Sequence, residues 1–379
     1  VLNVLILSCR TGEGHNAAAR AVAETLREQG DTCEFLDVLS LVSSNVSKKV
    51  EKTYVLTTRV PSVFGLLYKA GRAISTPKHK SPVYWANRLY RDKLYEHLIS
   101  RSFDAVVTSH LFPAEVLTSL KRENRLPVKT LAIATDYTCI PFWEETECDY
   151  YILPHKDLVE EFRKKQMPKE KLYPLGIPVS KPFRTRGSRQ EAREILGLPS
   201  RLPVFLIMTG SMGYGRIEDT IQELVNLYGS RAVIVVICGN NAKLKESLEN
   251  QCKGHPNVII QGFTKKIPLY MDACDVLFSK PGGLTSTEAA VKGVPLIHTA
   301  PIPGCENRNA AFFARRGMSY YCQEPAQQAK YAKLLCENQF LRFRMAEAQR
   351  RNTNAGSAEE ICGLLRQAVG SDEVTSCMF

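Results

Sequence analysis

The residues best suited to bind an anionic ligand lie between Lys280 and His298, in the sequence Lys-Pro-Gly-Gly-Leu-Thr-Ser-Thr-Glu-Ala-Ala-Val-Lys-Gly-Val-Pro-Leu-Ile-His. Gly282 and Gly283 stand where a short apolar strand is expected to give way to a helix, so the backbone there can approach a ligand closely. The free N–H groups and positive dipole end of such a helix favour an anion such as phosphate. Glu288, about one and a half turns further on, is placed to accept hydrogen bonds from a ribose. The plain alternative is a turn that only links strand to helix, with Glu288 exposed to solvent.

A histidine at the start of another expected helix is the second candidate. The first expected strand runs into Ser8-Cys-Arg-Thr-Gly-Glu-Gly-His15, and an alanine-rich helix follows. The loop differs from the G-x-G-x-x-G of nicotinamide sites, because Ala17 stands where the third glycine is expected. The helix dipole disfavours an imidazolium there, so a neutral His15 would serve as a base or a hydrogen-bond partner. The alternative is a histidine that only caps the helix or contacts phosphate.

Polar residues also follow several other expected strands. The carboxylate of Asp136, in Ala134-Thr-Asp-Tyr137, could orient His15 or accept a proton itself, and a turn-capping aspartate is the ordinary alternative. Three loops in the second half have backbone amides for phosphate, an aromatic ring for a flat base and polar groups for sugar hydroxyls. Their key residues are Ser211 with Gly213, Phe263 with Thr264, and Glu306 with Asn309. Together they predict a pocket for a nucleotide-diphosphate sugar.

Paired carboxylates of the Asp-x-Asp type, which usually hold the divalent metal of a sugar-nucleotide transferase, occur nowhere in the sequence. The charge of a diphosphate leaving group would then be met by a helix dipole, backbone amides and Lys280 or Arg216. The sequence therefore predicts chemistry without a metal and without a bound cofactor.

Length and composition indicate a two-domain globular protein. The chain has 379 residues, 44% of them hydrophobic, and no apolar run approaches the ~18 residues of a membrane-spanning helix. The twelve cysteines are scattered without a Cys-x-x-Cys pair, which favours reduced, mostly buried thiols in a cytoplasmic protein.

The positive charge is concentrated in one stretch. The net charge is +11, and residues 48–101 hold twelve basic residues against three acidic ones, interleaved with aromatic residues that include Tyr68 and Trp85. This mixture suits the surface of an anionic membrane. Nucleic acid is the rival partner, but no zinc-finger spacing or aromatic RNA-binding signature accompanies the charge. A solvated, partly disordered loop is the remaining alternative.

Short apolar runs alternate with helical patterns throughout, which predicts α/β domains with parallel sheets. The expected strands cover residues 3–8, 33–37, 104–108, 129–135, 150–153 and 172–175 in the first half, and 204–209, 232–238, 258–261, 275–278 and 295–298 in the second. A glycine and two prolines in residues 176–183 mark the linker. We therefore expect doubly wound domains over residues 1–176, with an insertion at about 41–101, and 177–355. They would face a central cleft, and a final helix in 356–379 would cross back to the first domain.

In this combination and order, the sequence resembles a known enzyme family. The segments that carry the resemblance are Gly-Glu-Gly-His15, Thr135-Asp136-Tyr137, Gly262-Phe263-Thr264, Lys280-Pro-Gly-Gly-Leu-Thr-Ser-Thr-Glu288 and Pro303-Gly-Cys-Glu306-Asn-Arg-Asn309. They resemble the monogalactosyldiacylglycerol synthases and the processive diacylglycerol glucosyltransferases, which are GT-B enzymes related to the peptidoglycan lipid GlcNAc-transferase. Relatives often carry a histidine shortly after the Thr-Asp-aromatic segment. This chain has none there, which leaves the acceptor open.

The resemblance implies inverting transfer of a hexose from UDP-glucose or UDP-galactose to diacylglycerol or a similar lipid. His15, aided by Asp136, would deprotonate the acceptor hydroxyl. The resemblance places Phe263 by the uracil, Glu288 by the ribose, and Glu306 with Asn309 by the sugar. The diphosphate would lie against Gly282, Gly283, Leu284 and Thr285. Gly14, Tyr68, Trp85 and Trp143 would belong to the acceptor or membrane side.

The implied location is the cytoplasmic, inner face of the cell membrane, with no nucleic acid bound. Three other functions remain open at this point: GlcNAc-type transfer to a polyprenyl-linked acceptor, a UDP-sugar epimerase, and a non-catalytic sugar-nucleotide sensor. The basic aromatic stretch argues against the epimerase, because a soluble substrate gives no reason for a membrane patch.

Overall fold

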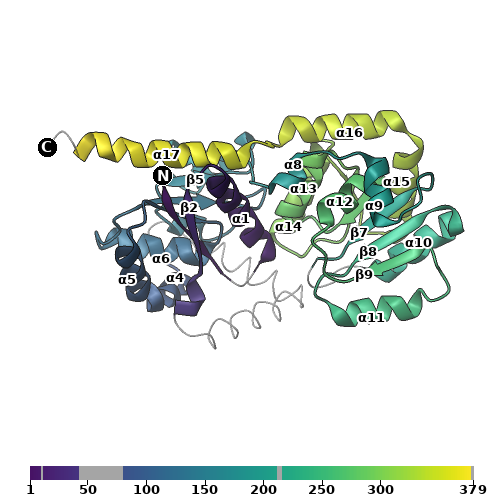
Figure 1. Ribbon diagram of the computed structural model, residues 1–379, viewed down its shortest axis with the longest axis horizontal. Coiled ribbons are helices and arrows are strands. Elements are labelled where there is room, and N and C mark those ends of the chain that lie inside the picture. Colours follow the sequence, from purple (N-terminus) through teal and green to yellow (C-terminus); the bar gives the residue numbers. More distant parts are fainter. Residues whose placement is uncertain (10–11, 42–79, 211–215, 377–379) are drawn as a thin grey trace. The chain divides into compact units, whose positions relative to one another are not determined.

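The computed structural model describes residues 1–9, 12–41, 80–210 and 216–376. They form two compact units, which we call unit 1 (Val1–Ser180 with Asn354–Phe379) and unit 2 (Lys181–Thr353) (Figure 1). Among the described residues, each unit contains one six-stranded sheet whose paired strands are all parallel. The α/β fold expected from the sequence is confirmed. Ser211, Gly213, Tyr68 and most of the basic stretch lie outside the described residues.

The sheet of unit 1 has the strand order β2-β1-β3-β4-β5-β6. Its strands are β1 (Asn3–Ser8), β2 (Thr32–Asp37), β3 (Ala105–Thr108), β4 (Lys129–Ile133), β5 (Tyr150–Ile152) and β6 (Leu172–Tyr173). The consecutive residues Val4, Leu5, Ile6 and Leu7 are all fully buried. Such a run requires cover on both faces of the sheet, as parallel sheets have.

Helices supply that cover. In unit 1 they are α1 (Glu13–Glu28), α4 (Pro82–Asn87), α5 (Arg91–Arg101), α6 (Leu111–Arg122), α7 (Val159–Lys164) and α17 (Ser357–Ser376), with short 3-10 turns at Val38–Leu41, Arg88–Tyr90, Trp143–Glu145, Lys156–Leu158 and Lys169–Lys171. Val4 and Ile6 pack against α1 and α17, whereas Leu5 and Leu7 pack against α5 and α6. The alternation of side chains along β1 thus divides the core of unit 1 between two helical layers.

Helix α17 completes unit 1 from the far end of the sequence (Figure 1). Ile361, Cys362 and Leu365 are buried against the apolar face of α1. At the start of α17, the Ser357 hydroxyl donates to the Gly176 carbonyl (2.8 Å), and just before the helix the Asn354 amide donates to the Leu175 carbonyl (2.9 Å). Unit 1 therefore cannot be built from a continuous stretch of the chain.

The sheet of unit 2 has the order β12-β11-β10-β7-β8-β9. Its strands are β7 (Val204–Met208), β8 (Val233–Ile237), β9 (Val258–Gln261), β10 (Val276–Ser279), β11 (Leu296–His298) and β12 (Tyr320–Tyr321). Its helices are α8 (Lys181–Arg184), α9 (Arg189–Leu196), α10 (Ile217–Tyr228), α11 (Ala242–Gln251), α12 (Ile267–Ala273), α13 (Gly283–Lys292), α14 (Cys305–Arg315), α15 (Pro325–Glu337) and α16 (Gln339–Asn352), with a 3-10 turn at Gly229–Arg231. The buried cores of β7, β8 and β10 pack against apolar residues of α10, α11 and α15.

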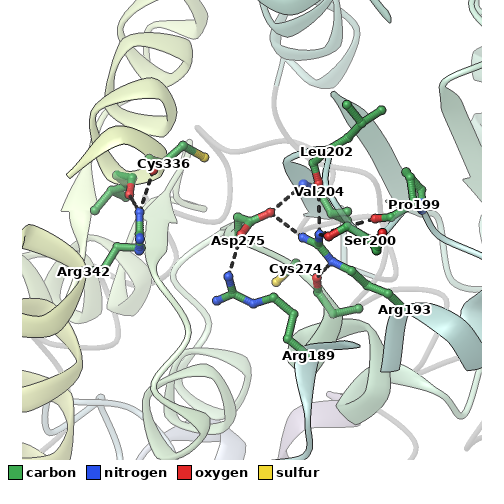
Figure 2. A network of polar contacts seen from close by, with 12 residues as sticks. Arg189, Arg193, Pro199, Ser200, Leu202, Val204, Cys274, Asp275, Cys336 and Arg342 are labelled. Carbon is green, nitrogen blue, oxygen red and sulfur yellow. Dashed lines mark hydrogen bonds and ion pairs between the residues drawn. The ribbon is translucent and has the colours of Figure 1, made fainter. Parts of the chain in front are cut away.

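A buried arginine fixes the entry into the central strands of unit 2. Arg193 on α9 is 5% exposed and donates to the carbonyls of Ala273 (2.9 Å), Ser200 (2.9 Å) and Leu202 (3.1 Å). It also pairs with the carboxylate of Asp275 (2.6 Å), the residue before β10 (Figure 2). Asp275 in turn accepts the N–H of Val204 at the start of β7 (2.8 Å). Arg193 thereby ties together the starts of the two strands that lie at the centre of the sheet.

Strand order also locates the ligand-binding edge of each sheet. In unit 1 the order reverses between β1 and β3, and in unit 2 it reverses between β7 and β10. In open parallel sheets, ligands bind beyond the carboxyl ends of the strands at such a switch point. His15 follows β1, and the Lys280 to Gly283 turn follows β10, so the two leading candidates both occupy switch points.

Several details differ from the sequence expectation. The sequence pattern of residues 83–100 predicts one helix, but these residues form α4, a 3-10 turn and α5. At the break, the Asn87 side chain accepts the Tyr90 hydroxyl (2.8 Å) and donates to Glu115, which turns Tyr90 into the core. The described cysteines are free and most are buried, as expected. In the part of the chain that the structure covers, the helices lack the combined length and hydropathy that a bilayer span requires.

Candidate active site

His15 is held where three strand ends of unit 1 meet. It is the third residue of α1, whose N-terminal cap is Gly12 in the left-handed conformation (φ 80°). A Cβ atom on Gly12 would lie 2.5 Å from His15 Cδ2, so only glycine leaves room for the ring. His15 Nδ1 lies 2.6 Å from the Thr135 hydroxyl, beyond β4, and the Ser109 hydroxyl, beyond β3, donates to the His15 carbonyl (2.7 Å).

The surroundings keep the His15 ring neutral. Burial lowers the pKa of His15, while the nearby carboxylate of Asp136 and a hydrogen bond with the Ser109 backbone act in the opposite direction. When Nδ1–H donates to Thr135, Nε2 is left with the lone pair that a general base needs. The Asp136 carboxylate would then stabilise the imidazolium that forms when Nε2 takes up a proton.

A second histidine belongs to the same cluster and was missed from the sequence. The ring of His110 lies 5.3 Å from that of His15, nearly at right angles. Its Nδ1 accepts the N–H of Phe112 at the start of α6 (3.3 Å), and burial lowers its pKa well below the ordinary value. The sequence feature that could have identified His110 is its position two residues after β3. Strand β3 lies on the other side of the switch point from β1, which His15 follows.

The residues expected on the acceptor side fall into two groups. Gly14 is exposed on the first turn of α1, and Trp85 is 56% exposed on α4. Trp143, in contrast, is 3% exposed and packs edge-on against Tyr151. Its expected contact with an acceptor or membrane surface is therefore wrong, because the apolar ring fills the core of unit 1.

An open pocket of about 500 Å³ lies beside Trp85. Lys80, Tyr84, Arg88 and Arg122 contribute to its lining. Arg88 stacks over the Trp85 ring (4.9 Å to its centre), and Leu89 on the following turn is 80% exposed. Basic residues and exposed apolar side chains thus occur together in residues 80–101, the part of the basic stretch that the structure describes.

In unit 2 the glycine turn after β10 leads directly into α13, as expected. Gly282 is the N-terminal cap, Gly283 is the first helical residue, and no side chain of the described residues caps this end. The first N–H groups of α13 are therefore left for a ligand. Leu284 is buried on this first turn, and Thr285 is partly exposed.

Two side chains from α14 support this turn. The Asn309 amide donates to the Pro281 carbonyl (3.0 Å), and Asn309 has no exposed surface. Glu306 is 6% exposed, pairs with Lys280, and accepts the N–H of Ile302 (2.8 Å). Both residues were expected beside the sugar of a ligand. In this structure, Asn309 holds the turn that precedes α13.

Glu288 is buried on α13, so the alternative of a solvent-exposed side chain is wrong. Burial raises the pKa of Glu288 to about 8. Because burial penalises the ionised form of this carboxyl group, hydroxyl donors that hydrogen-bond to the carboxylate would stabilise it and lower its pKa. Phe263 lies beyond β9 with 66% of its surface exposed, and the adjacent Thr264 hydroxyl accepts the N–H of Lys266 (3.1 Å).

Comparison with known families agrees with both halves of this description. Residues 15–179 match the monogalactosyldiacylglycerol (MGDG) synthase family. Residues 204–361 match the glycosyltransferase family 28 C-terminal domain. The first match begins at His15, and the second contains α13 and α14.

Similar proteins and structures extend over nearly the whole chain. A processive diacylglycerol beta-glucosyltransferase of Staphylococcus saprophyticus is 28% identical, over 85% of this chain and 81% of the relative. One from Bacillus thuringiensis is 24% identical, over 92% of this chain and 89% of the relative.

Solved structures share the fold. MurG of Acinetobacter baumannii has a TM-score of 0.63 at 16% identity, covering 97% of this chain and 100% of that one. A putative UDP-N-acetylglucosamine 2-epimerase of Listeria monocytogenes has a TM-score of 0.64 at 12% identity, covering 98% and 97%. The fold alone therefore does not separate transferases from epimerases. The family matches do, and the chain belongs to the GT-B glycosyltransferases that join an MGDG synthase domain to a glycosyltransferase family 28 C-terminal domain.

Proposed function

We propose that the protein transfers a hexose from UDP-glucose or UDP-galactose to diacylglycerol or a closely related lipid, with inversion at the anomeric carbon. One observation carries the proposal. His15 is neutral, is oriented by Thr135, and lies near Asp136 at the switch point of unit 1. The relatives named diacylglycerol beta-glucosyltransferases support the lipid acceptor and the β-linked product.

In the proposed reaction, the acceptor oxygen attacks the anomeric carbon while its proton passes to His15 Nε2. The bond between that carbon and the β-phosphate oxygen breaks, and UDP leaves. Asp136 stabilises the imidazolium by its charge. The uncapped end of α13 and the ammonium of Lys280 meet the charge that develops on the diphosphate. This supply of positive charge is our reason for proposing a reaction without a metal.

We place the donor in unit 2 and the acceptor in unit 1. Phe263 would stack on the uracil, Glu288 would bind the ribose, and Glu306 would face the sugar hydroxyls. The exposed Trp85 and Leu89, with basic residues in the lining of the pocket beside them, support peripheral contact with an anionic membrane surface.

Incubation of the purified protein with each UDP-sugar and diacylglycerol vesicles tests the proposal. We expect release of UDP and formation of a hexosyl lipid, with the same rate in excess EDTA. Failure to release UDP and to form glycolipid with either donor and any lipid acceptor would contradict the proposed function. Loss of activity in EDTA that is restored by a divalent cation would contradict only the metal-independent part.

Binding of UDP should depend on the ionisation of Glu288. Ribose hydroxyls would donate to the Glu288 carboxylate and lower its pKa from the value of about 8 that burial gives it. A lower pKa in the complex means that UDP binding releases a proton, so affinity rises with pH until Glu288 is ionised in the free protein. Calorimetric titration should show a roughly fivefold to tenfold increase from pH 7 to 8.5. Glu288→Gln retains the titration of UDP itself and should flatten this increase. Equal pH dependence in the wild-type protein and in Glu288→Gln would show that Glu288 does not bind the ribose.

Substitution of Gly12 should impair turnover by displacing His15. In Gly12→Ala, the new Cβ atom collides with the imidazole and the backbone keeps an unfavourable φ. We expect kcat to fall about a hundredfold, since a misplacement of about 1 Å can have that effect. Gly30→Ala is the matched control at the other end of α1, because it also has a positive φ but its Cβ atom would meet nothing within 4 Å. The expected position of His15 would be contradicted if both variants kept the wild-type kcat.

A further inference from the structure

The carboxylate of Glu306 lies at the N-terminal end of α13. Its Oε1 pairs with Lys280, its Oε2 accepts the Ile302 N–H (2.8 Å), and Oε1 would lie 4.0 Å from a Cβ atom on Gly282. The side chain is 8% exposed. The Glu306 carboxylate is therefore an anion of the protein itself at the place where the proposed function puts the diphosphate of the donor. The inference below rests on that proposed function.

Lys280 is fixed at the same point from the strand side. Its stem crosses Gly210 at the end of β7, where an added Cβ atom would lie 3.0 Å from Lys280 Cε. Its Nζ would lie 3.7 Å from a Cβ atom on Gly282, so the ammonium stands at the mouth of α13. Lys280 thus reaches the cap of α13 and the carboxylate of Glu306 at once.

Arg216, the other cation considered for the diphosphate, is already engaged elsewhere. It pairs with Asp219 (2.7 Å) and Glu324 (3.3 Å), and its side chain is 60% exposed. Lys280 is 24% exposed, so its charge acts in a less polarisable and less screened environment. The geometry therefore favours Lys280 as the cation that meets the leaving group.

We propose that Lys280 exchanges Glu306 for the diphosphate when the donor binds, and that the released Glu306 then turns to the sugar. The pair Lys280–Glu306 thereby makes recognition of the sugar depend on the diphosphate. Uridine alone lacks the anion that can replace the carboxylate, and it leaves the pair intact. Pyrophosphate has the anion without the nucleoside, so it competes with Glu306 directly.

Binding of uridine, UDP and pyrophosphate to single variants tests this exchange. Lys280→Met loses a charged hydrogen bond to phosphate, so its affinity for UDP and pyrophosphate should fall by about 10- to 100-fold. Glu306→Gln removes the competing charge, and its affinity for the same two ligands should rise about tenfold. Uridine affinity should stay within about twofold of wild type in both variants, which also shows that they are folded.

The surface pair Lys333–Glu337 on α15 provides matched controls. Its residues are 49% and 66% exposed, and Lys333→Met and Glu337→Gln should leave all three affinities unchanged. Unchanged or weaker binding of UDP and pyrophosphate in Glu306→Gln would overturn the exchange. Opposite shifts in pyrophosphate affinity, in a protein that transfers no sugar, would instead support the exchange and overturn the proposed function.

Discussion

Replacement of His15 by alanine should lower kcat by about 10³- to 10⁴-fold, which is the upper part of the range for a general base. The ring is neutral, its Nδ1 is engaged by Thr135, and no other described group with these contacts stands at the end of β1. The donor residues lie in unit 2, so calorimetry should show UDP affinity within about twofold of wild type.

Glu13→Gln is the matched control for this substitution. Glu13 precedes His15 on the same turn, is 71% exposed, and contacts only Arg20 among the interactions that the structure gives it. Its removal should leave kcat almost unchanged. If His15→Ala turned over at the wild-type rate, His15 would have no part in proton transfer. If UDP binding were lost as well, the substitution would act on the fold or the donor site.

The second large effect concerns the stability of unit 2. Arg193→Met leaves the partly buried Asp275 with the exposed Arg189 as its remaining ion partner, and strips several carbonyls of their donor. Breaking a buried ion pair from one side costs about 3 to 5 kcal/mol of the free energy of unfolding. Urea denaturation measures this loss. Because Asp275 fixes the start of β10, UDP affinity should fall in the same variant before global unfolding.

Arg189→Met is the comparison for Arg193→Met, since both arginines contact the carboxylate of Asp275 (Figure 2). The side chain of Arg189 is 42% exposed, so water replaces it easily and the expected loss is below about 1 kcal/mol. Equal losses in the two variants would show that burial of Arg193 does not set its contribution.

Much of the fold was predictable, because parallel strands buried on both faces leave strong apolar runs in the sequence. Strands β1 and β9 have the expected bounds, and most others differ by one or two residues. Strand β12 has only Tyr320 and Tyr321 and leaves too short a pattern to detect. The sequence pattern did not predict helices α8, α9, α12 and α16. Arg193 shows the difficulty, since a buried charge interrupts the apolar periodicity of α9.

The site was predictable where backbone conformation restricts the residue type. Glycines at the mouths of α1 and α13 point to the right strand ends from the sequence alone. His110 was missed because its link to His15 runs across two strands distant in sequence. Trp143 was misplaced because an aromatic residue after a strand suits a core as well as a surface. The pairing of Lys280 with Glu306 depends on how two loops meet, which residue spacing does not encode.

The most direct test is to analyse the lipids of a bacterial host that makes no glycosyl diacylglycerol and expresses either the wild-type protein or His15→Ala. Mass spectrometry and NMR of the extracted lipids give the mass, the sugar and the anomeric configuration. The account predicts a β-linked hexosyl diacylglycerol in the wild-type host and almost none with His15→Ala. It would be contradicted by an α-linked product, by equal amounts of glycolipid in both hosts, or by no new glycolipid in either.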